Sequence, residues 1–183
     1  MSDHARHPVE TPLVVMGVSC VGKTTVGVLL AEHLGMPFYD ADDLHGPANI
    51  AKMSAGIPLD DDDRAPWLDR VGIELAASPT PVIACSALKR MYRDALRAHA
   101  PNVRFIFLTA PAATLIEMAS TRTGHFMPAE LLQSQLDTLE PLDADENGMT
   151  ITVDAPATEL VERVRERLSA ASPHPHSLLG TRR

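Results

Sequence analysis

One stretch near the N-terminus, GVSCVGKT at residues 17–24, limits what the rest of the chain can fold into. It has the spacing G-x-x-x-x-G-K-[ST], in which the backbone N–H groups of a glycine-containing loop surround the phosphates of a nucleotide. The apolar run LVVM precedes it, and the helical pattern Val26, Leu29, Leu30 and Leu34 follows. Because this motif requires a strand before it and a helix after it, we interpret it as a phosphate-binding loop rather than a chance glycine turn.

The residues of this loop have separate expected roles. Lys23 supplies positive charge to the phosphate oxygens, and the Thr24 hydroxyl can ligate Mg²⁺. The positive end of the following helix faces the same phosphates. The sequence therefore predicts a site for a nucleoside triphosphate with Mg²⁺. The expected nucleotide-binding residues are Gly17, Val18, Ser19, Cys20, Val21, Gly22, Lys23, Thr24 and Thr25.

Apolar segments alternate with helical patterns along the whole chain. This alternation predicts an α/β fold, with a parallel sheet of about five strands covered by helices on both faces. Ligands of such folds bind outside the carboxyl ends of the strands. The expected strands are 13–16, 36–39, 81–85, 103–108 and 150–153. The expected helices are 24–34, 47–55, 64–77, 88–99, 111–121, 129–136 and 158–168.

Length and composition fit one soluble domain. The chain has 183 residues, and we expect a disordered leader at 1–11, a single domain at 12–170 and a disordered tail at 171–183. A formal net charge of −8 argues against a nucleic-acid partner. No apolar run is long enough to span a bilayer, and the first residues lack the apolar centre of a signal peptide. Cys20 and Cys85 have no metal-ligand spacing, and nothing in the sequence requires an oxidising compartment. We therefore expect a cytoplasmic protein, and the missing apolar run argues against a membrane partner.

Acidic residues follow the second expected strand rather than the third or fourth. Asp40 and Asp42 are two apart, so in extended backbone their carboxylates point the same way, toward the sheet edge that carries Lys23. One of the two can hold a Mg²⁺-bound water while the other accepts a proton from an incoming hydroxyl. Aspartate clusters more often form turns and helix caps, but this position favours the site of a small-molecule kinase.

Cationic residues suggest both a lid and an anionic acceptor. Arg122, followed by Thr123-Gly124-His125, stands in an expected lid at about 121–135, where it can neutralise the transferred phosphoryl group. Arg64 can grip a carboxylate in bidentate fashion. Lys89, Arg90 and Arg93 follow the end of the third expected strand. The alternatives are a surface arginine at 122 and a solvated helical face at 89–93.

The chain resembles the gluconate kinases, relatives of shikimate kinase and the nucleoside monophosphate kinases, over about residues 13–155. The segments that carry this resemblance are MGVS at 16–19, Asp42-x-Leu44-His45, Asn49-Ile50-x-Lys52-Met53, Gly56-x-Pro58-Leu59-x-Asp61-Asp62-Asp63-Arg64-x-Pro66-Trp67-Leu68, CSALK at 85–89, Tyr92-Arg93-Asp94, Gly124-His125-Phe126, Ser134-Gln135 and Leu139-Glu140.

The resemblance implies a three-layer P-loop fold of the nucleoside monophosphate kinase type and transfer of the ATP γ-phosphate to the 6-hydroxyl of D-gluconate. It also implies a homodimer. By the resemblance Lys23, Asp42 and Arg122 are catalytic, and Thr24 and Asp40 serve the metal. The implied substrate-binding residues are Asp42, His45, Arg64, Lys89, Arg90, Arg93 and His125.

The chain departs from the family pattern at two places. Cys20-Val21 stands where relatives generally carry Gly-Ser, and an arginine that stacks on adenine is absent near Met118–Ala119. Two other functions therefore stay open: a kinase of the same fold for another small polyol acid such as shikimate, and a nucleotide-binding regulatory module with weak turnover.

Overall fold

The computed structural model describes residues 11–77, 79–121 and 129–170 of the chain. Within these residues five strands form one parallel sheet, as predicted, and their order is β2-β3-β1-β4-β5. The strands are β1 (Leu13–Met16), β2 (Phe38–Asp40), β3 (Val82–Ala84), β4 (Arg104–Thr109) and β5 (Gly148–Thr152). The helices are α1 (Lys23–Leu34), the 3₁₀ helix η1 (Ala41–Leu44), α2 (Pro47–Ser54), α3 (Asp61–Leu75), α4 (Arg90–His99), α5 (Ala112–Thr121), α6 (Ala129–Thr138) and α7 (Ala157–Ala170).

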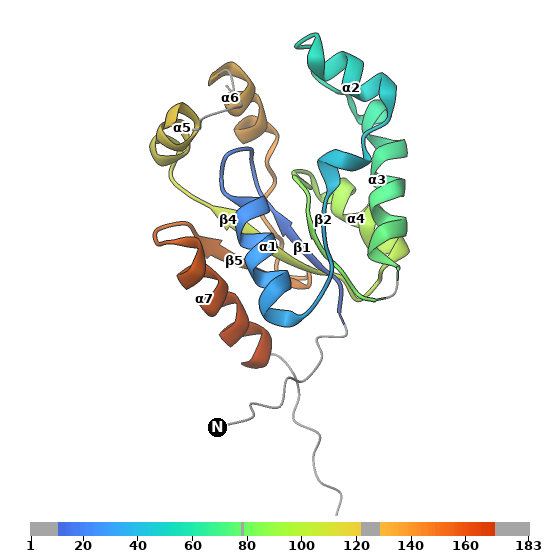
Figure 1. Cartoon of the computed structure of the whole chain (residues 1–183). Helices are drawn as coiled ribbons and strands as arrows, with labels where there is room; N and C mark the ends of the chain where they lie inside the picture. The colour runs from blue at the N-terminus through green and yellow to red at the C-terminus, as the bar shows by residue number, and fades with distance from the viewer. Residues whose placement is uncertain (1–10, 78, 122–128, 171–183) are drawn as a thin grey trace, which may run out of the picture.

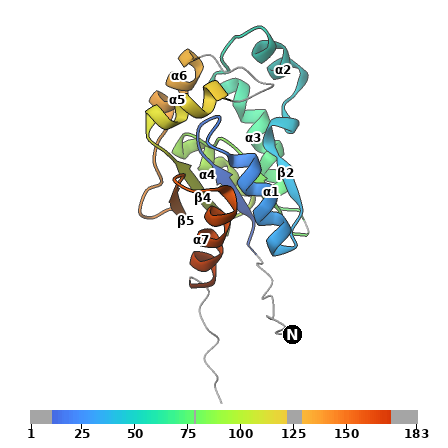
Figure 2. The same ribbon diagram turned by 60° about the vertical axis from the view of Figure 1, so that its left-hand side comes forward.

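Helices cover both faces of the sheet, which is what its uniformly apolar strands predict. In β1, Leu13 and Val15 pack on the face that α1 and α7 cover. Val14 and Met16 pack on the opposite face, under α3 and α4. The two helix pairs flank the sheet in both views of the molecule (Figures 1 and 2). The alternation along β1 thus divides the core into two layers.

The order of the strands places a binding crevice at the end of β1. The chain passes from β1 through α1 to β2, and β3 then fills the position between these two strands. The next connection returns past β1 to β4 on its other side, so β1 marks the point where the strand order reverses. At this end of the sheet, α2 stands on one side and α5 and α6 stand on the other (Figures 1 and 2).

The acidic run at residues 60–63 caps and begins a helix. α3 starts at Asp61, three residues before the expected start at Arg64. Asp60 caps it: its Oδ1 accepts from the Asp63 backbone N–H at 2.8 Å, and Asp63 Oδ2 accepts from the Asp60 N–H at 3.1 Å. These carboxylates stabilise the positive end of the helix.

None of the helices in the described ranges is long and apolar enough to cross a membrane.

Candidate active site

The loop between β1 and α1 has the conformation that its glycines predict. Gly17 (φ 141°) and Gly22 (φ 95°) adopt backbone conformations that other residues rarely adopt. A Cβ on Gly17 would lie 2.5 Å from the Leu108 carbonyl oxygen, so β4 also excludes a larger residue there. The Gly17 N–H donates to the Ser86 carbonyl at 3.3 Å, which joins the loops after β1 and β3.

Lys23 lies over this loop at the start of α1. Its Nζ donates to the Val18 carbonyl at 3.0 Å. Desolvation lowers the pKa of the Lys23 ammonium, and the nearby Asp42 carboxylate acts in the opposite direction. Lys23 is therefore folded back on the loop, within electrostatic range of the acids that follow β2.

Cys20 has a left-handed conformation (φ 66°), which costs a residue with a side chain about 1–2 kcal/mol. Glycine removes this strain, but its greater conformational entropy in the unfolded chain lowers the stability by about 0.4–1 kcal/mol. We expect Cys20→Gly to raise the free energy of unfolding by roughly 1 kcal/mol in urea titrations. Cys20→Ala is the control, because it removes the sulfur and keeps the strain. A glycine variant no more stable than the alanine variant would contradict the prediction.

Asp40 and Asp42 both reach the site, but not through the extended backbone that the sequence suggested. Asp40 ends β2 and caps η1: its Oδ1 accepts from the Asp42 N–H at 3.1 Å. Asp42 therefore lies in the first turn of a 3₁₀ helix. The other oxygen of Asp40 accepts from the Thr24 hydroxyl at 2.8 Å, so the two residues expected to serve the metal are in contact.

The carboxyl group of Asp42 stands in an unusual electrostatic environment. Desolvation and repulsion by Asp40 raise its pKa, whereas Lys23 and His45 act against the increase. Asp42 is thus within electrostatic range of both the lysine of the phosphate loop and His45, which follows η1. A carboxylate with a raised pKa accepts a proton more readily than an ordinary aspartate.

His45 lies flat on the indole ring of Trp67, with the ring centroids 4.4 Å apart and the planes 11° from parallel. Trp67 is held by its Nε1–H, which donates to the Ala41 carbonyl at 2.7 Å. Asn49 Nδ2 donates to the Asp63 carbonyl at 2.8 Å and lies 3.3 Å from His45 Nδ1. If Nδ1 accepts from Asn49, Nε2 carries the proton of a neutral ring. Burial lowers the pKa of His45, which favours that neutral form.

Arg64 and Lys89 form one cluster around Asp61 and Tyr92. Lys89 Nζ contacts the two Asp61 oxygens at 2.8 and 2.9 Å, and the Tyr92 hydroxyl also donates to Asp61. Arg64 Nη1 donates to the Tyr92 hydroxyl at 3.3 Å. Hydrogen bonds from Lys89 and Tyr92 lower the pKa of Asp61, so this acid is ionised at neutral pH. The cluster brings two predicted cations together around one carboxylate.

Arg93 and Arg90 point away from the Lys89 cluster. The complete burial of Arg93 corrects the prediction that it binds substrate, whereas the exposed Arg90 stays a predicted substrate contact. Arg93 is completely buried, and its guanidinium donates to Glu146 and to four backbone carbonyls. All of its N–H groups are occupied inside the protein. Arg90 donates to Asp143 and Asp145 at 2.7–2.8 Å. One turn of helix carries the three cations, but they point in different directions.

Several contributing residues had no predicted role. Asn49 and Trp67 support His45, and Asp61 and Tyr92 organise the cations, although all four stand in the family-like segments. Gln135 of α6 contacts the phosphate loop at Ser19. Arg122 and His125 lie outside the described residues, as does the part of the expected lid between α5 and α6.

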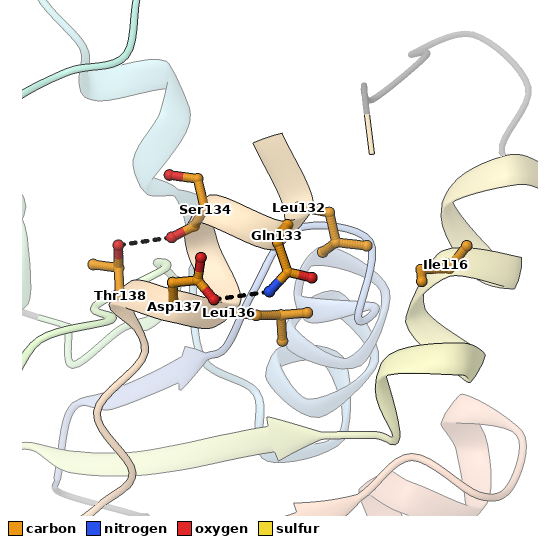
Figure 3. Close-up of a pocket in the computed structure, with 7 residues that line it drawn as sticks. All are labelled: Ile116, Leu132, Gln133, Ser134, Leu136, Asp137 and Thr138. Atoms are coloured by element: carbon orange, nitrogen blue, oxygen red, sulfur yellow. Dashed lines mark hydrogen bonds between the residues drawn. The ribbon is translucent and has the colours of Figure 1, made fainter. Parts of the chain in front are cut away.

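A separate hollow of about 560 Å³ lies beside α6. Ile116 of α5 faces it, and the remaining lining residues belong to α6 (Figure 3). Gln133 and Asp137 are hydrogen-bonded to each other at 2.8 Å on its wall. None of the residues that line this hollow is among the predicted site residues.

Comparison with known proteins adds an independent observation. The family model for shikimate kinase matches residues 19–140. A probable gluconokinase of Rattus norvegicus is 44% identical, in an alignment that covers 87% of this chain and 99% of the relative. The gluconokinase of Gluconobacter oxydans (strain 621H) is 49% identical over 73% of this chain and 78% of its own length.

A solved structure agrees with these relatives. The crystal structure of a gluconokinase from Sinorhizobium meliloti 1021 superposes with a TM-score of 0.83 at 48% identity, covering 88% of this chain and 93% of that one. The phosphate loop, the acids after β2 and the chain's near-complete coverage of relatives above 40% identity all agree. This chain therefore belongs to the gluconokinase family of P-loop kinases.

Proposed function

We propose that the protein transfers the γ-phosphoryl group of ATP to the 6-hydroxyl of D-gluconate, giving 6-phospho-D-gluconate and ADP. The observation that carries this proposal is that Asp42 is within electrostatic range of both Lys23 and His45. A carboxylate in this position interacts electrostatically both with the lysine of the phosphate loop and with a predicted substrate-binding residue. The names and similarity of the relatives supply the identity of the acceptor.

ATP would bind with its phosphates along residues 17–25, where backbone N–H groups and Lys23 compensate their charge. Thr24 and Asp40 fit Mg²⁺, because they offer neighbouring oxygen ligands of the kind that this ion prefers. Among the described residues, no group of three or more His, Cys, Asp or Glu could hold a metal ion alone. That composition suits Mg²⁺ held mainly by phosphates and water, where it would neutralise charge on the phosphate oxygens.

Gluconate would lie between Asp42 and the cation cluster. Asp42 accepts the proton of the 6-hydroxyl, and the Nε2–H of neutral His45 donates to a substrate hydroxyl. Arg64 and Lys89 bind the gluconate carboxylate in competition with Asp61, which already neutralises part of their charge. Arg122 as a cation for the transferred group and His125 as a substrate contact stay predictions, as do the homodimer and the cytoplasmic location.

A coupled assay of ADP release with Mg²⁺ tests the proposal. We expect turnover with D-gluconate, and little or none with shikimate or related sugar acids, because the substrate-facing residues match the gluconate kinases. Turnover of another polyol acid but not of gluconate would contradict the assignment of the acceptor. ATP binding without turnover of any acceptor would instead support a regulatory module.

A further inference from the structure

The side chain of Gln135 in α6 is hydrogen-bonded to Ser19 of the phosphate loop. The Ser19 N–H donates to Gln135 Oε1 at 2.6 Å, and Gln135 Nε2 donates to Ser19 Oγ at 2.9 Å. The two residues are 116 positions apart in the chain, and both hydrogen bonds are partly buried. The orientation of the amide is fixed by this pair, because only its oxygen can accept from a backbone N–H.

The N–H that Gln135 binds belongs to a peptide unit that Lys23 binds from its other end. A peptide unit is planar and joins the carbonyl of one residue to the N–H of the next. Here the Val18 carbonyl accepts from Lys23 Nζ at 3.0 Å, and the Ser19 N–H of the same unit donates to Gln135. Rotation of this plane would break both contacts and turn the Val18 carbonyl away from Lys23.

We propose that Gln135 is a positioning residue of the nucleotide site: it fixes the Val18–Ser19 peptide plane and, through it, the position of Lys23. This inference rests on the proposed kinase function and adds a residue to it. Gln135 does not touch the reacting atoms. It acts on the lysine that compensates the phosphate charge, so its loss should affect ATP more than gluconate.

A purely structural role for Gln135 is the alternative, and α6 offers the means to separate the two. Apolar side chains already attach this helix to the core, with Leu132 fully buried and Leu136 packed beside it. Methionine at position 135 keeps the length of the side chain and removes only its amide. Gln133→Met is the matched control, because Gln133 pairs with Asp137 within α6 (Figure 3).

Gln135→Met should lower kcat/KM for ATP by about 10–100-fold, since misplacing a catalytic group by an ångström can cost a factor of that size. The KM for gluconate and the urea midpoint should stay close to those of Gln133→Met. Amide hydrogen exchange at Ser19 should be faster in Gln135→Met than in the control. A Gln135→Met enzyme that matches Gln133→Met in ATP kinetics and in Ser19 exchange would overturn the inference.

A double-mutant cycle with Ser19→Ala separates the two hydrogen bonds. Alanine keeps the backbone N–H of residue 19 and removes the hydroxyl. If the peptide plane is what matters, Gln135→Met should cost the same factor in the Ser19→Ala background as in the wild type. If the double variant is no worse than Ser19→Ala alone, only the hydroxyl bond matters and the inference is wrong.

Equilibrium binding of Mg·ATP makes the test independent of the acceptor. Should the wild type bind ATP but fail to phosphorylate gluconate, the proposed function would fail. Weaker Mg·ATP binding by Gln135→Met than by Gln133→Met would still support the positioning role. Equal binding by the two variants, with equal Ser19 exchange, would count against it.

Discussion

Asp42→Asn should lower kcat for gluconate phosphorylation by a factor of about 10²–10⁴, while ATP binding stays close to that of the wild type. Asparagine keeps the size of the side chain but cannot accept a proton from the incoming hydroxyl. The backbone N–H of residue 42 still donates to Asp40, so η1 should keep its geometry. Steady-state kinetics with both substrates varied, together with a direct titration of ATP, measure the two effects separately.

Asp43→Asn is the matched control, because it makes the same change of charge on the neighbouring residue of the same short helix. Its kcat should stay close to that of the wild type. Desolvation and Asp40 raise the pKa of Asp42, and the active form is the carboxylate. Wild-type kcat/KM should therefore fall as the pH falls through this raised pKa, and Asp42→Asn should lack that decrease. An unchanged kcat in Asp42→Asn would show that positioning alone carries the transfer.

The parts of this site that the sequence predicts are those whose geometry is local. The spacing from Gly17 to Lys23, between an apolar run and a helical pattern, predicts the phosphate loop. The parallel sheet follows from the alternation of strands and helices, and it brings the ends of β1, β2 and β3 to one edge. Thr24 and Asp40 are 16 residues apart, and they meet there because the sheet brings the ends of β1 and β2 to the same edge.

The direction of a side chain on a helix depends on distant partners, and the sequence predicted it poorly. Lys89 and Arg93 lie within one turn and carry the same charge. Lys89 turns to Asp61, whereas Arg93 turns to Glu146, which is 53 residues away in the chain. The residues next to Lys89 and Arg93 in the sequence do not indicate which acidic side chain each cation contacts in the folded protein. The contact of Gln135 with Ser19 was missed for the same reason.

Local capping explains the remaining differences. Asp60 and Asp63 form a capping box, with aspartate where glutamate or glutamine is usual, and α3 therefore begins three residues before the expected start at Arg64. Asp40 caps η1 through its Oδ1, and this short helix re-aims Asp42. Both side chains satisfy backbone N–H groups that begin a helix, and hydrophobic periodicity contains no information about them.

Arg93→Met should lower the free energy of unfolding by about 3–5 kcal/mol, the usual cost of removing one partner of a buried ion pair. Arg93 and Glu146 are completely buried as side chains and lie 2.7 Å apart. Methionine would leave a buried carboxylate with Arg97 as its remaining charged partner, and it would remove the hydrogen bonds that Arg93 donates to four backbone carbonyls. Urea unfolding followed by circular dichroism measures the loss.

Arg90→Met is the control for this variant, since Arg90 lies on the same helix and its ion pairs with Asp143 and Asp145 are exposed. It should cost less than about 1 kcal/mol, as exposed ion pairs do. The opposite pattern, with Arg93→Met as stable as Arg90→Met and a raised KM for gluconate, would restore Arg93 to the substrate site. Comparison of the two variants thus distinguishes a role of Arg93 in stability from a role in substrate binding.

The acid stability of the protein provides a second test of the same pair. Burial alone would raise the pKa of Glu146, but hydrogen bonds from Arg93 and Arg97 outweigh it and lower the pKa from 4.5 to about 2. The stabilisation that Glu146 provides is therefore complete above its unfolded pKa, and it is lost as the pH falls through 4.5 toward about 2. Glu146→Gln removes the titrating group and keeps the shape, so its stability should vary less with pH over this window. Equal slopes in the two proteins would show that other carboxylates, and not the Arg93–Glu146 pair, govern acid unfolding.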